Sequence, residues 1–325
     1  MSSKRRVGIL GCAAIAKRSL APAFNAHSGF ELAAIASRTP DKAVEFAGQY
    51  GATPCSYDEL VECGDIDLVY CPLPTGLHYE WVKKCLLSKK HVLCEKSLAI
   101  NYEQVKDLVE MARNNGCFLM ESFQFRFHPQ NLYVKNLLSE NAIGEIRGLD
   151  VKFGFPPFPD GAKNIRYSKA LGGGALLDSG AYTVKATTYL LGDDFQVKMA
   201  MCGKHANCEV DLDGHLWLQS SDGLVSKTTY GFHNYYQCGY EIWGEKGKII
   251  TTRAFTAKPD FSAEVKVETA AGTKVEKFQA DHFALMLDHI ATQLKDGDFE
   301  EEYNQCLVQS RILTQAQHAL GLNLI

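Results

Sequence analysis

The sequence predicts an α/β fold of two domains, in which a parallel sheet covered by helices is followed by an α+β domain with a mostly antiparallel sheet. The chain has 325 residues, more than one ordinary hydrophobic core needs. Up to residue 122, continuous apolar runs alternate with helical segments, as in parallel sheets buried on both faces. From residue 209 onward apolar residues recur at every second position, as in strands with one buried face. We therefore expect domains at residues 1–122 and 123–325.

Five apolar runs of the first domain are predicted strands, at 5–10, 31–37, 66–71, 91–95 and 117–122. Signals that start helices lie between them. Thr39 before Pro40 predicts a cap with proline at the first helical position. Ser56 and Glu59 predict a capping box, and Asn101 precedes a helix with one apolar face.

The second domain begins with a proline-started helix at 129–139 and a strand at 145–153. A loop rich in proline and glycine follows and leads to a helix that carries Asp178. Alternating runs separated by glycine-containing turns predict antiparallel strands, at 209–219, 226–236, 240–252 and 264–278. Two helices, near 281–295 and 304–319, end the sequence.

The composition, 46% hydrophobic and 22% charged residues, is that of a soluble globular protein. The net charge of -4, with both signs interspersed, gives no basic surface for nucleic acid. There is no run of about 18 apolar residues that would predict a membrane span. Eleven scattered cysteines, without CxxC pairs, predict reduced thiols in the cytoplasm and no structural zinc.

The first predicted strand leads into the segment GILGCAAIA, residues 8–16. A dinucleotide-binding turn needs a glycine, small residues where the backbone meets the pyrophosphate, and a helix N-terminus facing the phosphates. Gly11 supplies the turn, and Ala13 and Ala16 stand where the second and third glycines would be. The segment predicts a Rossmann domain with cofactor contacts from Gly11, Cys12, Ala13, Ala14 and Ile15.

The residues after the second strand indicate which cofactor binds. Sites that prefer NAD place Asp or Glu there to accept hydrogen bonds from the ribose hydroxyls. This sequence has Ser37 and Arg38, with Lys42 one turn later. A guanidinium pairs with a 2′-phosphate and stacks on adenine, so the sequence favours NADP (NADPH) over NAD.

Lys96 follows the fourth predicted strand, in the run Cys94-Glu95-Lys96-Ser97. Ligands of open α/β sheets bind beyond the carboxyl ends of the strands. We therefore expect Lys96 to lie where a nicotinamide ring and a substrate meet. Its ammonium can hydrogen-bond a substrate oxygen and lower the pKa of a neighbouring group.

Four motifs together resemble the Gfo/Idh/MocA oxidoreductases: GILGCAAIA, CPLPTGLHYEW, the Glu95-Lys96 pair and GGGALLDSGAY. The resemblance spans nearly the whole chain. It implies a Rossmann domain and a second domain with a large, open, mostly antiparallel sheet. It also implies hydride transfer on sugars, inositols or related diols.

The resemblance assigns Lys96 to the lysine of the family's EKP motif, with Ser97 in place of the proline. It also implies cofactor contacts from the loop beside the nicotinamide and from residues near Lys96, namely Cys71, Pro72, Leu73, Pro74, His78 and Glu95. Thr75 replaces the usual asparagine of that loop. Arg126 lies in a segment that resembles the family's entry into the second domain, where it would reach the cofactor and the substrate.

The family's third motif is an aspartate followed four residues later by a histidine. Asp178 matches the aspartate, but Tyr182 takes the histidine position. This resembles the subgroup of nucleotide-sugar 3-ketoreductases and dihydrodiol or xylose dehydrogenases. A spacing of four places both side chains on one helix face. Lys185 stands where many relatives carry an acid.

These residues suggest a mechanism for carbonyl reduction. NADPH delivers hydride to a carbonyl carbon, Tyr182 protonates the developing alkoxide, and Lys96 is its electrostatic partner. Asp178 orients a substrate hydroxyl, and alcohol oxidation uses the same groups in reverse. Arg166 is a candidate contact for a substrate phosphate, with Tyr167 beside it in the same loop.

Other conspicuous residues are expected to be structural. Gly172, Gly173 and Gly174 let the chain turn into the Asp178 helix. His282 and His289 share a helix face with acidic neighbours, and we expect packing or surface roles there, with no metal. The aromatic residues between 230 and 243 are expected to pack the sheet or a subunit interface.

The leading hypothesis is an NADP-dependent nucleotide-sugar ketoreductase. The alternatives are a trans-dihydrodiol or xylose-type aldose dehydrogenase, and a non-catalytic cofactor-binding sensor. Lys96 with Tyr182 argues against a sensor, which needs no proton donor. The expected partner is a sugar or nucleotide sugar, with no nucleic acid and no membrane. The open sheet predicts a homo-oligomer, either a dimer or a tetramer.

Overall fold

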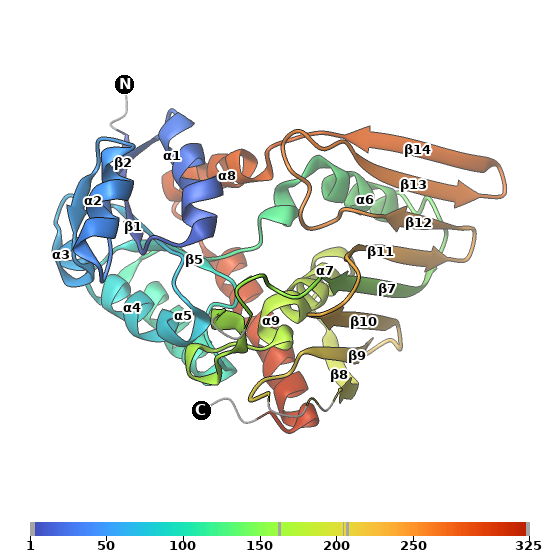
Figure 1. Ribbon diagram of the computed structural model, residues 1–325. Coiled ribbons are helices and arrows are strands. Elements are labelled where there is room, and N and C mark those ends of the chain that lie inside the picture. The colour runs from blue at the N-terminus through green and yellow to red at the C-terminus, as the bar shows by residue number, and fades with distance from the viewer. Residues whose placement is uncertain (1–3, 162–163, 204, 206–207, 323–325) are drawn as a thin grey trace. The chain divides into compact units, whose positions relative to one another are not determined.

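The computed structural model describes residues 4–161, 164–203, 205 and 208–322. The chain divides into two compact units, each with its own sheet (Figure 1). Unit 1 comprises Met1–Ser122 and Phe283–Leu307, and unit 2 comprises Phe123–His282 and Val308–Ile325. The assignment of two domains to residues 1–122 and 123–325 stays a prediction.

Unit 1 contains a six-stranded parallel sheet with the order β3-β2-β1-β4-β5-β6. Its strands are β1 (Arg5–Leu10), β2 (Phe30–Ala36), β3 (Thr53–Cys55), β4 (Leu68–Cys71), β5 (His91–Glu95) and β6 (Leu119–Ser122). This is the strand order of doubly wound dinucleotide-binding sheets, in which ligands bind where the order reverses. The strand order reverses between β1 and β4. The neighbouring strands pair in parallel, which confirms the predicted parallel sheet.

The strands of unit 1 are apolar because both faces of the sheet are covered. Ile9, Ile35 and Val69 are fully buried, and each such side chain contributes about 1.5–3 kcal/mol when it leaves water. The continuous apolar runs in the sequence therefore reflect two-sided burial and not alternation.

The helices of unit 1 follow most of the predicted start signals. Up to Ser122 they are α1 (Ala21–Ala26), α2 (Pro40–Gly48), α3 (Tyr57–Glu62), α4 (Thr75–Leu87) and α5 (Tyr102–Asn115), and unit 1 also takes in Phe283–Leu307 from the last two helices. The capping box of Ser56 and Glu59 is present, and Asn101 accepts a hydrogen bond from the Gln104 N–H at 3.0 Å. The prediction for Thr39 was wrong in one respect, because its side chain makes no cap hydrogen bond.

Unit 2 contains an eight-stranded sheet with the order β14-β13-β12-β11-β7-β10-β9-β8. Only the β7–β10 pair among these is parallel, so the mostly antiparallel sheet is confirmed for the described residues. The strands are β7 (Ile146–Gly154), β8 (Phe195–Cys202), β9 (Asp213–Ser220), β10 (Val225–Gly231), β11 (Gln237–Gly244), β12 (Gly247–Thr251), β13 (Ala263–Thr269) and β14 (Gly272–Phe278).

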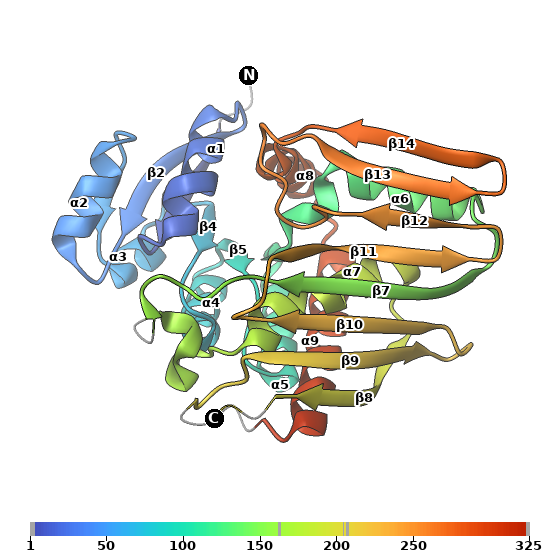
Figure 2. The same cartoon turned by 45° about the vertical axis from the view of Figure 1, so that its right-hand side comes forward.

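Helices cover one face of this sheet. Figure 2 shows α6 (Pro129–Ser139) and α7 (Ala181–Leu191) behind the strands, whereas the face toward the viewer carries no helix among the described residues. The chain ends with α8 (His282–Asp296) and α9 (Glu300–Leu320). No helix in the described part of the chain has the length and hydrophobicity to cross a bilayer.

β3 and β8 were missing from the sequence prediction, and the predicted runs 240–252 and 264–278 each form two antiparallel strands joined by a turn. β3 has three residues, includes Pro54 and lies at the edge of its sheet, where proline is tolerated because one side of the strand makes no ladder hydrogen bonds. β8 is the edge strand of the second sheet and exposes Met199 and Met201. Both strands are specified by a neighbouring strand more than by a hydrophobic pattern of their own.

His128 is a fully buried histidine at the start of α6. Its Nδ1 accepts a hydrogen bond from the Gln130 N–H at 3.3 Å, which caps the helix. Burial lowers the pKa of His128 from 6.5 to about 4, and a protonated Nδ1 could no longer accept this bond. The folded protein therefore keeps His128 neutral at pH values where the unfolded chain takes up a proton.

Acid should destabilise unit 2 through His128. Because the folded pKa lies below the unfolded one, this contribution is complete above pH 6.5 and is lost as the pH falls toward about 4. The loss amounts to about 3 kcal/mol of unfolding free energy. Urea unfolding of His128→Asn, which keeps a capping side chain, should show a flatter pH dependence by this amount.

The matched control is His215→Asn, which replaces an exposed histidine on β9 and should keep the wild-type slope. An unchanged slope in His128→Asn would contradict the assigned role of His128.

Candidate active site

In unit 1, the turn after β1 has the backbone that a bound dinucleotide requires. Gly11 has a φ of 122°, and a Cβ there would lie 2.9 Å from Leu73 Cδ2, so only glycine fits without strain. The Gly11 N–H donates to the Ala36 carbonyl at 3.0 Å. Helical structure begins at Ala14, and residues Ala16–Leu20 form a π-helical segment. The first backbone N–H groups of such a helix can donate hydrogen bonds to a bound anion.

The end of β2 lies beside this turn. The Ser37 N–H donates to the Cys55 carbonyl at 3.2 Å, and the Ser37 hydroxyl accepts from the Thr39 N–H at 3.1 Å. Cys12 Sγ lies 3.6 Å from the carbonyl oxygen of Lys42. Arg38 is exposed. The predicted phosphate turn and the predicted ribose contacts therefore meet at one edge of the sheet.

His78 connects two loops at the same edge. It is fully buried; its Nδ1 lies 2.8 Å from the Ser97 carbonyl and its Nε2 lies 2.6 Å from the Leu73 carbonyl. Burial lowers the pKa of His78 to about 4, and the charge of Lys96 acts in the same direction. His78 thus lies between the Pro72–Pro74 loop and the turn of Lys96, and a neutral ring donates a hydrogen bond to one of the two carbonyls.

The thiols of Cys71 and Cys94 lie close to His78, and the three possible ligand atoms fall within 4.8 Å of one another. Both ring nitrogens of His78 already face carbonyl oxygens. Burial also raises the pKa of Cys94 well above its ordinary value, which disfavours the thiolate that a metal needs. This group therefore packs as part of the core.

Lys96 stands next to the half-buried carboxylate of Glu95. Glu95 accepts a hydrogen bond from the Tyr70 hydroxyl at 2.8 Å. Burial raises the pKa of Glu95, whereas Tyr70, Lys96 and Ser122 lower it. The peptide bond between Lys96 and Ser97 is cis. Glu95 thus anchors the base of the turn that presents the lysine.

In unit 2, Tyr182 lies on α7 inside an aromatic cage and is 8% exposed. Its neighbours are Phe123, Phe125, Phe153 and Phe255, with ring centroids 5.1–6.0 Å away. The Tyr182 hydroxyl lies 3.4 Å from Gln124 Oε1. The sequence analysis did not identify Gln124, although it belongs to the same FQFRF segment as Arg126.

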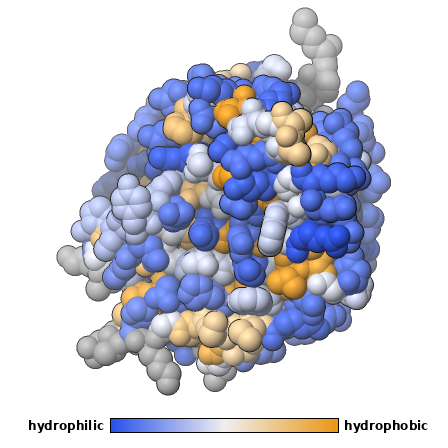
Figure 3. Space-filling view, turned by 90° about the vertical axis from the view of Figure 1, so that its right-hand side faces the viewer, coloured by the Kyte–Doolittle hydropathy of each residue, from blue (hydrophilic) through white to orange (hydrophobic). Residues whose placement is uncertain are grey.

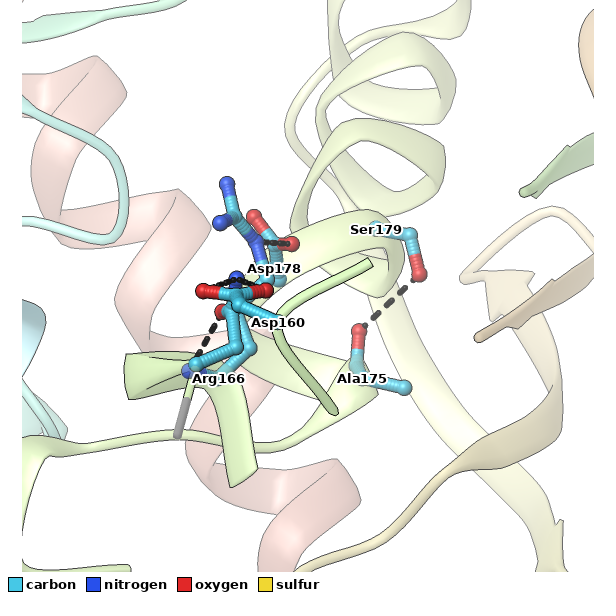
Figure 4. A network of polar contacts seen from close by, with 6 residues as sticks. Asp160, Arg166, Ala175, Asp178 and Ser179 are labelled. Carbon is cyan, nitrogen blue, oxygen red and sulfur yellow. Dashed lines mark hydrogen bonds and ion pairs between the residues drawn. The ribbon is translucent and has the colours of Figure 1, made fainter. Parts of the chain in front are cut away.

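Asp178 is paired with Arg166, as Figure 4 shows. Arg166 Nε donates to Asp178 Oδ2 at 2.5 Å. The charge of Asp178 raises the pKa of Arg166, and Tyr182 acts in the same direction. Exposed ion pairs contribute only about 0–1 kcal/mol, so this partly exposed pair matters more for orientation and local charge than for stability. A contact of Arg166 with substrate phosphate stays a prediction.

Asp178 belongs to a π-helical segment, Leu176–Gly180, that precedes α7. The spacing of an ordinary α-helix therefore does not describe its direction relative to Tyr182.

Two further predicted residues also have partners within unit 2. The Tyr167 hydroxyl lies 2.8 Å from Nε2 of His233. Arg126 is 9% exposed; its guanidinium lies 5.2 Å from the Phe127 ring centroid, and its carbonyl accepts from the Tyr189 hydroxyl at 2.8 Å. Arg126 and Tyr182 are thus carried by adjoining parts of one unit.

The strand order of unit 1 and its glycine turn define a dinucleotide-binding fold. A family model described as an oxidoreductase family with an NAD-binding Rossmann fold matches residues 5–123. The model of the GFO/IDH/MocA C-terminal domain matches residues 131–250. The chain belongs to the Gfo/Idh/MocA oxidoreductase family, as its motifs predicted.

The relatives include sugar-modifying enzymes. The dTDP-3,4-didehydro-2,6-dideoxy-alpha-D-glucose 3-reductase of Saccharopolyspora spinosa is 40% identical, covering 81% of this chain and 79% of the relative. A D-xylose 1-dehydrogenase of Haloferax volcanii, named for NADP, is 31% identical and covers 90% and 89%. The structure of a 3-ketoreductase from Actinomadura kijaniata, in complex with NADP and TDP-benzene, has a TM-score of 0.93 at 35% identity and covers 98% of each chain. Further structures of that enzyme carry a replaced lysine or a replaced tyrosine.

Proposed function

We propose that this protein is an NADP-dependent ketoreductase of a nucleotide-linked sugar, acting on a 3-keto group. The observation that carries the proposal is similarity over 98% of both chains to a 3-ketoreductase that binds NADP and a TDP derivative, in a chain that retains Lys96 and Tyr182. The xylose dehydrogenase among the relatives makes free aldose oxidation the second candidate.

NADP fits the residues of unit 1. Gly11 gives the turn its positive φ, and the helix that follows can face a pyrophosphate. Arg38 and Lys42 would neutralise a 2′-phosphate, with Ser37 beside them. The Pro72–Pro74 loop, held by His78, would bound the nicotinamide end. The bound cofactor supplies the hydride in reduction.

Tyr182 is the proposed proton donor to the oxygen of the reduced carbonyl. Its aromatic cage excludes water from the ring, and the hydroxyl lies 3.4 Å from Oε1 and 3.5 Å from Nε2 of Gln124. The guanidinium of Arg166, which lies in the same unit, would stabilise the phenolate left after proton transfer. Asp178, held by Arg166, would orient a substrate hydroxyl.

Replacement of Tyr182 tests the chemistry. Tyr182→Phe keeps the aromatic packing and removes the proton, so kcat for a 3-keto nucleotide sugar should fall by about 100-fold or more, with little change in NADPH affinity. Lys96→Met should also lower kcat. The measurement is single-turnover NADPH oxidation against a panel of nucleotide-linked ketosugars, free aldoses and dihydrodiols.

The controls are Tyr235→Phe, at a side chain 89% exposed, and Lys106→Met on the surface of α5. Full turnover by Tyr182→Phe would contradict the assignment of Tyr182 as the proton donor. Turnover of free xylose with no response to nucleotide sugars would favour the second candidate, and cofactor binding without turnover on any substrate would favour a sensor.

Replacement of Arg38 tests the cofactor preference. Arg38→Asp places an acid where NAD-preferring sites have one, so the ratio of NADPH to NADH affinity should fall by about tenfold or more. Titration by quenching of protein fluorescence measures both affinities, with Arg147→Ala on β7 as the control. An unchanged ratio would remove the argument for NADP from Ser37 and Arg38.

We also propose that the protein is a cytoplasmic homo-oligomer, a dimer or a tetramer formed through the face of the second sheet without helices. Trp217 and Trp243 are 40% and 66% exposed on its strands, and Figure 3 shows hydrophobic patches among hydrophilic residues on the side of the chain that carries this sheet. Large exposed apolar groups mark interfaces, which supports the oligomer. Scattered cysteines suit a reducing compartment, which supports the cytoplasm.

Sedimentation velocity should give a multiple of the chain mass for the wild type and a smaller species for Trp217→Glu with Trp243→Glu. Leu87→Glu, at an exposed position of α4, is the control. A monomeric wild type would refute the interface.

A further inference from the structure

The helix that carries Asp178 and Tyr182 has no cap from its own neighbouring side chains. Its N-cap residue, Ala175, makes no side-chain cap hydrogen bond. The first amides instead bond to Asp211, which lies 35 residues beyond Leu176. The Ala175 N–H donates to the Asp211 carbonyl at 2.9 Å, and the Leu176 N–H donates to Asp211 Oδ2 at 2.7 Å.

Asp211 is a buried carboxylate, with only 5% of its surface exposed. Burial raises the pKa of Asp211 to about 6, and the hydrogen bond from Leu176 opposes that rise. A buried carboxylate is costly unless hydrogen bonds or a positive dipole compensate for lost water. The N-terminus of a helix supplies both. The buried Asp211 carboxylate is therefore stabilised by the start of this helix and not by packing alone.

The glycines before the helix close tightly around the same carboxylate. Gly174 has a φ of 112°, and a Cβ there would lie 2.3 Å from Asp211 Oδ1. A Cβ at Gly173 would lie 2.5 Å from the Arg166 carbonyl oxygen, which accepts the Gly174 N–H at 2.9 Å. The glycine turn is thus enclosed between Asp211 and the segment of Arg166.

Asp211 and the segment of Arg166, which enclose the glycine turn, both contact the first turn of the helix. Asp211 holds its backbone amides, and Arg166 holds the Asp178 side chain. Figure 4 shows the Arg166–Asp178 contact next to Ala175 and Ser179 in that turn. Tyr182 follows at the start of α7, so the position of its hydroxyl depends on the position of the first helical turn.

We propose that Asp211 is a positioning residue that fixes the first turn of this helix and thereby the direction of Tyr182. The proposal rests on the proposed function, in which Tyr182 is the proton donor. Displacement of a reacting group by about 1 Å can lower a rate by about 100-fold, so Asp211 acts on the chemical step through Tyr182.

Asp211→Ala removes the acceptor of the Leu176 N–H, and kcat should fall by about tenfold or more. NADPH affinity, which depends on unit 1, should not change. Asp211→Asn keeps an acceptor oxygen in place and should recover most of the lost kcat. The matched control is Asp213→Ala, two residues away, whose carboxylate accepts from the Gly203 N–H and contacts His205; it should keep the wild-type kcat.

A double-mutant cycle separates positioning from general destabilisation. In a Tyr182→Phe background, Asp211→Ala should lower kcat no further, because the group it positions is gone. The same fold-change in both backgrounds, or a wild-type kcat in Asp211→Ala, would overturn the inference. If Asp211→Ala does not fold, the cycle is run with Asp211→Ser, whose shorter side chain should lower kcat only while Tyr182 is present.

The two proposals fail separately. If Tyr182→Phe retains full kcat, the proposed proton donor is wrong, and Asp211 has nothing to position. If Tyr182→Phe loses kcat while Asp211→Ala does not, only the role of Asp211 is refuted.

Discussion

The parallel pairing of β1 with both β2 and β4 is the constraint on which unit 1 depends. Parallel strands that share a register end at one edge, so every loop that leaves their carboxyl ends must emerge there. The glycine turn, the Ser37–Arg38 pair and the Pro72–Pro74 loop are therefore neighbours in space. Leu73 makes the consequence concrete, because its side chain occupies the space beside Gly11 that a Cβ would need.

Unit 2 holds the phenol of Tyr182 and the carboxylate of Asp178 at the start of a helix. Aromatic rings surround Tyr182, while Arg166 and Asp211 hold the turn that precedes it. The hydrogen bonds of these side chains join separate segments, from 12 residues apart for Arg166 and Asp178 to 58 for Gln124 and Tyr182. Their energies are small individually, and their combined effect is directional more than stabilising.

Local signals were reliable where both partners lie within a few residues. The capping box of Ser56 and the Asn101 cap were predicted correctly because their side chains bond backbone amides only three residues away. Thr39 had the same type of signal, but Ser37 supplies the hydroxyl that accepts the Thr39 N–H. The edge strands β3 and β8 were missed because a neighbouring strand, and not their own periodicity, defines them.

The sequence by itself determined the change from a parallel to a mostly antiparallel sheet, the glycine turn at Gly11, and the presence of Lys96, Asp178 and Tyr182. These features depend on residue type and spacing, which short stretches of chain can encode. Only the tertiary structure decided that Asp178 pairs with Arg166, that Gln124 faces Tyr182, and that Asp211 caps the helix of Tyr182. The physical reason is that hydrogen bonds and ion pairs of buried polar groups join whichever partners the fold brings within about 3 Å, and sequence spacing does not encode that proximity.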